Sequence, residues 1–227
     1  KGGEDIFTQI CLATHENGEL LTEGEVVDHM NFLMMAAHDT ITSSATSLIY
    51  LLAKHPEWQD KIREECLSVA PAGTALSMEQ LGKLELTEMA FKEALRLIPP
   101  VPSMPRRAVK DFTFRNYTIP AGTTVGVSPS FVHKMEKHWP EPEKFDPLRF
   151  TPENSVGRHK YAWVPFGGGV HMCLGLHFAY MQIKILMHAM LTQNRVVLQG
   201  GPDYEPKWQV FPIPQPKDGL PVRLERL

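Results

Sequence analysis

The sequence has 227 residues, 43% of them hydrophobic and 22% charged, so it can bury a core and does not belong to the disordered class. Its 23 basic and 26 acidic residues give a formal charge of -3, which offers no electrostatic reason to expect nucleic acid as a partner. The cysteines are too few and too scattered for a disulfide scaffold and indicate a reducing compartment: Cys11, Cys66 and Cys173. No apolar run follows the first residues, so we expect no signal peptide and a cytoplasmic location.

The first long element is predicted to be a helix from Glu23 to about His55, because Pro56 restricts the residue before it. Between residues 29 and 53 the only formally charged side chain is Asp39, and a helix with so little charge on any side is expected to be buried. Asn, His, Ser and Thr interrupt its apolar runs, which excludes a membrane span. The sequence therefore predicts a core helix.

Two further helices are predicted before the first Pro-Pro pair. One covers residues 56–69, with Trp58, Ile62 and Cys66 on its buried face. The other starts at a capping box, whose first residue is Ser77, and continues to about Leu97.

The second half of the chain has a different texture. Short alternating runs and a Pro-Ala-Gly turn within residues 112–127 predict a small β-hairpin. Residues 139–164 have no clear periodicity and are expected to form a long irregular meander. A helix at about 174–191 and a final strand at 220–224 complete the prediction.

The segment 165–175, Pro-Phe-Gly-Gly-Gly-Val-His-Met-Cys-Leu-Gly, has the strongest chemical signal. Its three glycines allow close approach of a bulky flat or anionic group, and a cysteine at a helix N-terminus is stabilised as thiolate. The loop lacks the Gly-Lys-Ser/Thr end of a phosphate loop and the glycine spacing of a dinucleotide site. Zinc bound by His171, Cys173 and His177 has no fourth ligand nearby, and a buried structural cysteine in a glycine turn is the plainest alternative.

The pattern Phe-x-x-Gly-x-His-x-Cys-x-Gly resembles the haem-binding loop of the cytochrome P-450 family, and its members here are Phe166, Gly169, His171, Cys173 and Gly175. Three outlying motifs strengthen the resemblance. Residues 93–96 match the family's Glu-x-x-Arg, and residues 146–150 resemble its meander motif. Residues 36–40 stand where the family has its oxygen-activation motif and depart from it at Ala37, where glycine is usual. The likeness covers about residues 20–227, and His38 adds a mild similarity to sterol-demethylating and lipid-hydroxylating bacterial members.

The resemblance implies a mainly α fold with small β-sheets, the C-terminal half of the cytochrome P-450 fold. Residues 1–227 would then be the haem-binding portion of a single domain whose N-terminal half is absent. It also implies haem b as cofactor, with the Cys173 thiolate as axial ligand to iron. The implied roles are catalytic proton management by Asp39 and Thr40, propionate binding by Arg106, Arg107 and His171, and structural support from Glu93, Arg96 and Arg149.

One local expectation accompanies these roles. A threonine in the middle of a helix can hydrogen-bond the carbonyl four residues earlier, which for Thr40 is that of Ala36, and so loosen the helix into a groove. The alternative for its neighbour Asp39 is a paired buried acid.

The activity implied by the resemblance is a monooxygenase that inserts one oxygen atom of dioxygen into a hydrophobic substrate such as a sterol, fatty acid or terpenoid. Electrons would come from a ferredoxin or flavoprotein reductase, for which the basic run Arg158, His159 and Lys160 is either a docking patch or an ordinary solvated turn. Two alternatives stay open: a truncated, non-catalytic haem-binding fragment, and a zinc-binding structural module.

Overall fold

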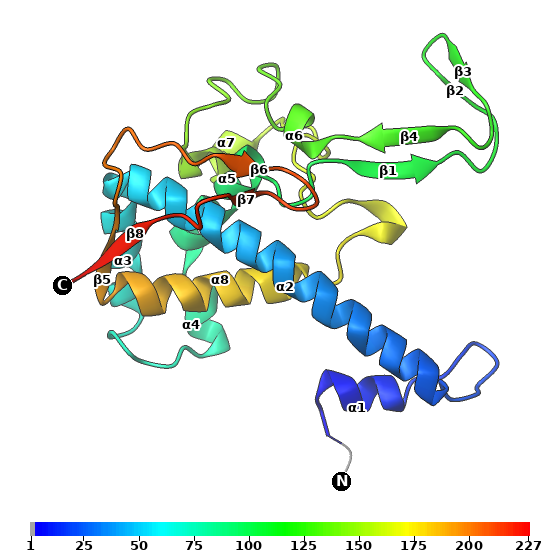
Figure 1. The fold of residues 1–227 in the computed structure, drawn as a ribbon, viewed down its shortest axis with the longest axis horizontal. Helices are drawn as coiled ribbons and strands as arrows, with labels where there is room; N and C mark the ends of the chain where they lie inside the picture. Colours follow the sequence, from blue (N-terminus) through cyan, green and yellow to red (C-terminus); the bar gives the residue numbers. More distant parts are fainter. Residues whose placement is uncertain (1–2) are drawn as a thin grey trace. The chain divides into compact units, whose positions relative to one another are not determined.

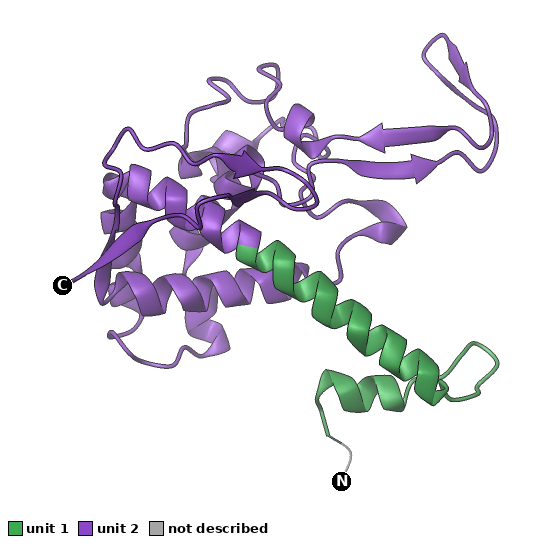
Figure 2. Cartoon of the chain, in the orientation of Figure 1, with its two compact units in different colours: residues 1–42 green, residues 43–227 purple. Residues whose placement is uncertain are grey.

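The computed structural model describes residues 3–227, which divide into two compact units (Figure 2). The first extends to Thr42 and the second begins at Ser43, so the boundary falls within the longest helix. Each unit is described by itself.

The first unit contains a short helix that the sequence did not predict, α1 (Ile6–Cys11), and the first part of α2 (Glu23–Lys54). The carboxylate of Asp5 caps α1 by accepting a 2.9 Å hydrogen bond from the Thr8 amide. At the start of α2, the side chain of Glu25 accepts from the Thr22 amide at 2.8 Å, which closes the first turn.

The bounds of α2 agree with the prediction for residues 23–55, but its burial agrees only in part. From Ser43 onward the helix has fully buried positions such as Leu48 and Leu52. Before Thr42 several large apolar side chains are exposed, such as Phe32 at 57% and Met35 at 67%, although Val26 is buried. The expected burial of this helix is therefore seen from Ser43 onward, while much of the apolar surface of its first part is left uncovered by the described residues.

The core of the second unit lies where α3 (Pro56–Val69), α5 (Glu85–Leu97) and α8 (Leu176–Leu191) pack against one another (Figure 1). The fully buried side chains at this junction are aliphatic and aromatic, including Ile62, Phe91, Leu95, Ile183, Met187 and Leu191. Trp58, Ile62 and Cys66 are buried on α3, as predicted.

The predicted helix over residues 77–97 is two helices, α4 (Met78–Gly82) and α5. The Ser77 capping box is present and starts α4. The chain then turns so that Leu84 is completely buried. The carboxylate of Glu65, on α3, accepts the amides of Leu86 and Thr87 at 2.5 and 2.9 Å. These two unpaired amides at the start of α5 are satisfied from another helix, which makes the break stable.

Four small antiparallel sheets complete the unit, each with two strands among the described residues. β1 (Met104–Arg107) pairs with β4 (Thr124–Val127), and β2 (Phe112–Phe114) pairs with β3 (Tyr117–Ile119). The predicted hairpin therefore exists, but the Pro-Ala-Gly turn joins β3 to a strand that pairs elsewhere. β5 (Asn194–Leu198) pairs with β8 (Val222–Arg226), and β6 (Trp208–Gln209) with β7 (Gln215–Pro216).

The predicted meander over residues 139–164 is confirmed, since it contains only the single turns η1 (Pro147–Phe150) and α7 (Pro152–Ser155). Another short helix, α6 (Pro129–Val132), precedes it, and η2 (Gly169–His171) follows it. Between residues 3 and 227, no helix is long and apolar enough to cross a bilayer.

Candidate functional site

The cysteine loop, residues 165–175, is closed by its own backbone. The Cys173 amide donates to the Phe166 carbonyl at 2.9 Å, and the Met172 amide donates to the Gly169 carbonyl at 3.1 Å. Gly167 and Gly169 have φ of 73° and 67°, a left-handed conformation that side chains rarely adopt. The glycines at these two positions therefore shape the loop.

The thiol of Cys173 is exposed and stands two residues before Gly175, which caps α8. The helix thus begins slightly later than predicted. A Cβ at Gly175 would lie 3.7 Å from the Cys173 sulfur, so the glycine leaves one flank of the sulfur open. Neighbouring apolar side chains along the chain are also exposed: Val170 at 96%, Met172 at 50%, Leu174 at 93% and Phe178 at 48%.

These features fit a flat, largely apolar group that carries a soft metal. A thiolate is the ligand that such a metal prefers, and the open flank provides room beside the sulfur. The alternative of a zinc module has no support, because no group of three His, Cys, Asp or Glu side chains within the described chain could hold a metal ion. Since Cys173 is exposed, the alternative of a buried structural cysteine was wrong.

The strand β1 lies against this loop. The Met104 sulfur is 3.6 Å from the position that a Cβ on Gly167 would take. Side chains two residues apart on a strand share a face, so Arg106 is on the same face of β1 as Met104. Arg107 is on the opposite face, where its Nη2 atom is 3.7 Å from the Cβ position of Gly122. Of the two arginines predicted to bind a propionate, only Arg106 shares the strand face that meets the loop.

Arg106 is exposed, and its Nη1 atom donates to the neighbouring Pro105 carbonyl at 2.8 Å. His171, at the end of η2, is also exposed. Both side chains therefore have polar atoms accessible to an external carboxylate.

A ladder of aromatic rings, which the sequence analysis missed, links the loop to the helices and to the meander. Successive ring centroids are 5.6 to 6.0 Å apart along the series Phe91, Tyr180, Phe166, Trp163, Phe150 and Trp139. Offset and edge-to-face contacts of this kind add to the stabilisation from burial. The predicted site residue Phe166 is therefore the point at which the loop joins the core.

One cluster contains the three residues that were predicted to have structural roles: Glu93, Arg96 and Arg149. Glu93 and Arg96 are completely buried and form a two-point ion pair at 2.7 and 2.8 Å. The Arg149 Nε atom lies 3.3 Å from the Glu93 carboxylate. Arg96 also donates to three carbonyls of the segment before and within the meander, those of His133, Pro142 and Lys144.

Burial is the largest influence on Glu93 and raises the pKa of its carboxyl, while the two arginines act in the opposite direction. A surface ion pair, the plain interpretation of the Glu-x-x-Arg spacing, is excluded by the complete burial of both partners.

Asp39 and Thr40 belong to the first unit. The expected hydrogen bond is present, since Thr40 Oγ1 donates to the Ala36 carbonyl at 2.8 Å. Thr42 makes the same bond to the His38 carbonyl at 2.9 Å. The Asp39 carboxylate contacts His38 Nδ1 at 2.8 Å, with the Asp39 side chain 63% exposed. It is therefore paired, but the alternative of a buried acid was wrong.

Comparison with known proteins places these features in a family. A family model described as Cytochrome P450 matches residues 3–222. A Mycobacterium tuberculosis protein named as cytochrome P450 136 is 42% identical over 98% of this chain and 45% of its own length. The beta-amyrin 28-monooxygenase of Kalopanax septemlobus is 35% identical over 97% of this chain and 45% of that protein.

Among solved structures, a retinoic acid-bound cyanobacterial CYP120A1 superposes with a TM-score of 0.91 and 33% identity, covering 100% of this chain and 52% of that one. The mainly α architecture with small sheets that the sequence predicted is confirmed by this match. The chain spans about half the length of the relatives that it resembles.

Proposed function

Because the chain belongs to the cytochrome P450 family, we propose that the protein is a haem-thiolate monooxygenase that inserts one oxygen atom of dioxygen into a hydrophobic substrate. The observation that carries this proposal is the exposed Cys173 thiol, held in a glycine-shaped loop directly before α8. Haem b supplies, when bound, the iron chemistry that activates dioxygen.

The residues that would hold the haem are on the loop and on β1. Cys173 would ligate the haem iron through its sulfur, and the exposed Arg106 guanidinium would bind a propionate. His171 is a weaker candidate for the second propionate, since a neutral imidazole donates only one hydrogen bond. Arg107 is the weakest, because it is on the strand face away from Met104.

Glu93, Arg96 and Arg149 would act by positioning. Through Arg96 they fix carbonyls of the meander, and the meander leads directly into the cysteine loop. Loss of this buried cluster should therefore weaken haem retention without removing a haem contact.

Asp39 and Thr40 would hold and move protons for oxygen activation. The Thr40 hydroxyl donates to the Ala36 carbonyl, and a bond of this kind can loosen a helix locally, which supports a groove at this turn. The neighbouring carboxylate and imidazole of Asp39 and His38 are both exposed and in contact, so they form a pair that can exchange a proton with solvent.

The substrate that we propose is a large, mainly hydrocarbon molecule of the sterol, fatty acid or terpenoid class. Two similar proteins carry names that include beta-amyrin and retinoic acid, both of which fit this description. The electron donor that we propose is a ferredoxin or flavoprotein reductase. A truncated, non-catalytic haem-binding role is the alternative that the relatives do not favour, since one of them is named as a monooxygenase.

The first experiment is the absorption spectrum of the protein loaded with haem, reduced and exposed to carbon monoxide. We expect the Soret band typical of thiolate-ligated ferrous haem in the wild type and in Cys66→Ser, whose thiol is buried elsewhere. Cys173→Ser should lose this band. Retention of the band in Cys173→Ser, or its absence from the wild type with haem bound, would refute the ligand assignment.

A second experiment tests the proton role. Thr40→Ala and Thr42→Ala each remove a hydroxyl that donates to the backbone carbonyl four residues earlier, so the two variants form a matched pair. With a donor system and a turned-over substrate, Thr40→Ala should divert reductant from product, while Thr42→Ala should leave the coupling unchanged. Equal coupling in the two variants would show that Thr40 has no special role, and absence of product from the wild type would favour the non-catalytic alternative.

A further inference from the structure

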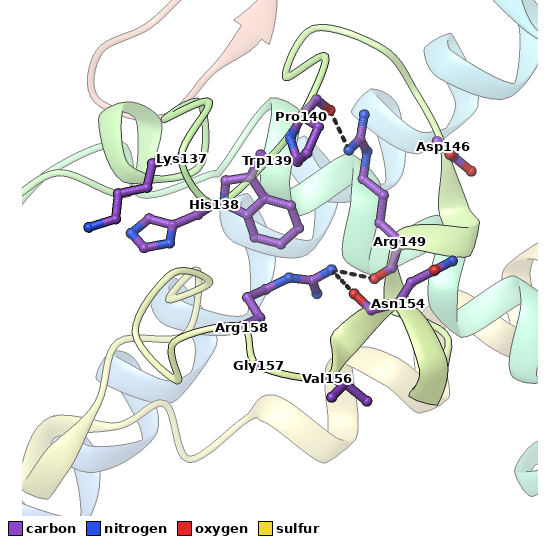
Figure 3. A pocket seen from close by; sticks show the side chains of 10 residues that line it. All are labelled: Lys137, His138, Trp139, Pro140, Asp146, Arg149, Asn154, Val156, Gly157 and Arg158. Atoms are coloured by element: carbon purple, nitrogen blue, oxygen red, sulfur yellow. Dashed lines mark hydrogen bonds between the residues drawn. The ribbon is translucent and has the colours of Figure 1, made fainter.

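A pocket of about 450 Å³ lies in the second unit, beside the meander (Figure 3). Its basic lining consists of Lys137, His138, Arg149 and Arg158, while Asp146 is the only acidic side chain that lines it. Figure 3 shows the Arg149 and Arg158 side chains to one side of the Trp139 ring and Lys137 and His138 to the other. No residue of the cysteine loop lines this pocket.

Two of the charged residues are already occupied by internal bonds. Arg149 lies against Glu93, and its Nη1 and Nη2 atoms donate to the Pro140 and Glu141 carbonyls at 2.6 and 2.8 Å. The Asp146 carboxylate accepts the Leu148 amide at 3.1 Å and so caps η1. Arg149 is therefore committed to Glu93 and to these carbonyls, whereas Asp146 keeps its negative charge, and the lining stays net positive through Lys137 and Arg158.

Arg158 is held in place by contacts that do not neutralise it. Its Nη2 atom donates to the Arg149 and Asn154 carbonyls at 2.5 and 2.9 Å, and its guanidinium carbon is 4.2 Å from the centre of the Trp139 ring. Arg158 forms no ion pair with any residue from 3 to 227, and its Nε and Nη1 atoms make no hydrogen bond there. Partial burial, the largest influence, lowers the pKa of this guanidinium.

Lys137 is exposed and likewise has no ion pair within the described chain. A second, larger pocket of the same unit makes the contrast plain. Its three lysines are paired: Lys54 with Glu205, Lys134 with Glu143 at 2.9 Å, and Lys144 with Glu141 at 3.9 Å. The first pocket therefore differs from the second, because two of its cations, Lys137 and Arg158, form no ion pair within the described chain.

We propose that this pocket binds a phosphate-sized oxyanion, either free or carried by a small polar molecule. Arg158 is the preorganised donor, because its stacking on Trp139 and its two carbonyl bonds fix the guanidinium before binding. Lys137 supplies the second charge from the rim. The volume is within the range of small-molecule sites, which is about 300–1,000 Å³.

The same charges could receive a carboxylate from a docked protein, as the basic run over residues 158–160 suggested. However, Arg158 lines the pocket, whereas Lys160 is exposed, does not line it, and lies 4.8 Å from the centre of the Tyr161 ring. The run is therefore divided between a pocket wall and the outer surface. An anion small enough to enter the pocket fits this division better than a broad protein surface does.

The experiment is calorimetric titration of the protein with inorganic phosphate near neutral pH, with chloride keeping the ionic strength constant. Lys137→Gln removes the rim charge, and Lys160→Gln is the matched control because it removes an exposed lysine outside the pocket. We expect saturable binding that Lys137→Gln weakens about 10-fold, since a charge-assisted hydrogen bond contributes about that factor. Lys160→Gln should stay within about twofold of the wild type, as expected for a screened surface charge.

Arg158→Lys is the second variant, because lysine keeps the charge but loses the planar fork, and it should also weaken phosphate binding. Far-UV circular dichroism of each variant establishes that its fold is intact. Absence of phosphate binding up to about 10 mM, far above the range of specific sites, would overturn the proposal. Equal weakening by Lys137→Gln and Lys160→Gln would do the same, and so would binding of an oligoglutamate peptide without binding of phosphate. None of these results depends on haem.

Discussion

His133 is a completely buried histidine whose surroundings require the neutral ring. Its Nε2 atom accepts the Val164 amide at 2.9 Å, so protonation there would place two donors against each other. Its Nδ1 atom is buried and has no hydrogen-bond partner in the described chain. Burial is the main cause that lowers the pKa of His133 from 6.5 to about 4, and the nearby Arg96 cation adds to it.

This shift makes stability dependent on pH with a definite sign. The unfolded chain binds a proton at His133 below pH 6.5, whereas the folded chain resists doing so until about pH 4. The stabilisation is therefore complete above the unfolded pKa and is lost as the pH falls between these two values. The fall in the pKa of His133 from 6.5 to about 4 should lower the free energy of unfolding by about 3 kcal/mol between pH 7 and pH 4, because the ring is already partly protonated in the unfolded chain at pH 7 and in the folded chain at pH 4.

Urea unfolding at a series of pH values from 7 to 4 measures this dependence. His133→Gln keeps an acceptor for the Val164 amide but cannot titrate, so its stability should fall about 3 kcal/mol less over that range. His159→Gln, at an exposed position, is the control and should follow the wild type. Parallel pH profiles for His133→Gln and the wild type would show that His133 has the same pKa in the folded and unfolded chains and would refute the reasoning.

Three further outcomes follow from individual side-chain environments. Arg96→Lys should lower the free energy of unfolding in urea by about 3–5 kcal/mol, because lysine cannot supply the guanidinium hydrogen bonds to the buried Glu93 carboxylate and to three carbonyls. A loss below about 1 kcal/mol, typical of surface pairs, would contradict this. Burial raises the pKa of the Cys66 thiol to about 11. At pH 8 a thiol reagent should therefore modify the exposed Cys173 of haem-free protein much faster than Cys66, and peptide mapping measures the two rates. Gly200→Ala would put a Cβ 2.7 Å from the Tyr204 ring and should lower stability by about 1–3 kcal/mol, and an unchanged midpoint of thermal unfolding would disprove that clash.

The helices that the sequence predicted well are those whose ends are set by neighbouring residues. Pro56 separates α2 from α3, and the Ser77 capping box starts α4 at the expected position. The break before α5 could not be predicted in this way, because the group that stabilises it is the Glu65 carboxylate from another helix. Pairing of β1 with β4 was missed for the same reason, since the strands are separated by a complete hairpin.

The candidate site likewise has features that neighbouring residues set and features that depend on distant contacts. The spacing of Phe166, Cys173 and Gly175 is local and indicates a loop with its cysteine before a helix, which the structure contains. Spacing alone could not reveal that Glu93 and Arg96 are buried, because an i,i+3 ion pair looks the same on a surface and in a core. Resemblance to a family identified these residues, and the contacts of Arg96 with meander carbonyls supply the physical reason for their position.

The first part of α2 has few charged residues, yet Asp39 is not buried there. The family resemblance implies a proton-handling role for Asp39, and the alternative was a paired acid buried in an apolar helix, where a lone carboxylate is costly. In this structure the Asp39 side chain is largely exposed and in contact with His38, so it incurs little desolvation here. The case for a proton-handling turn consequently depends on the Thr40 hydroxyl, whose bond to the Ala36 carbonyl is local, present and removable by one substitution.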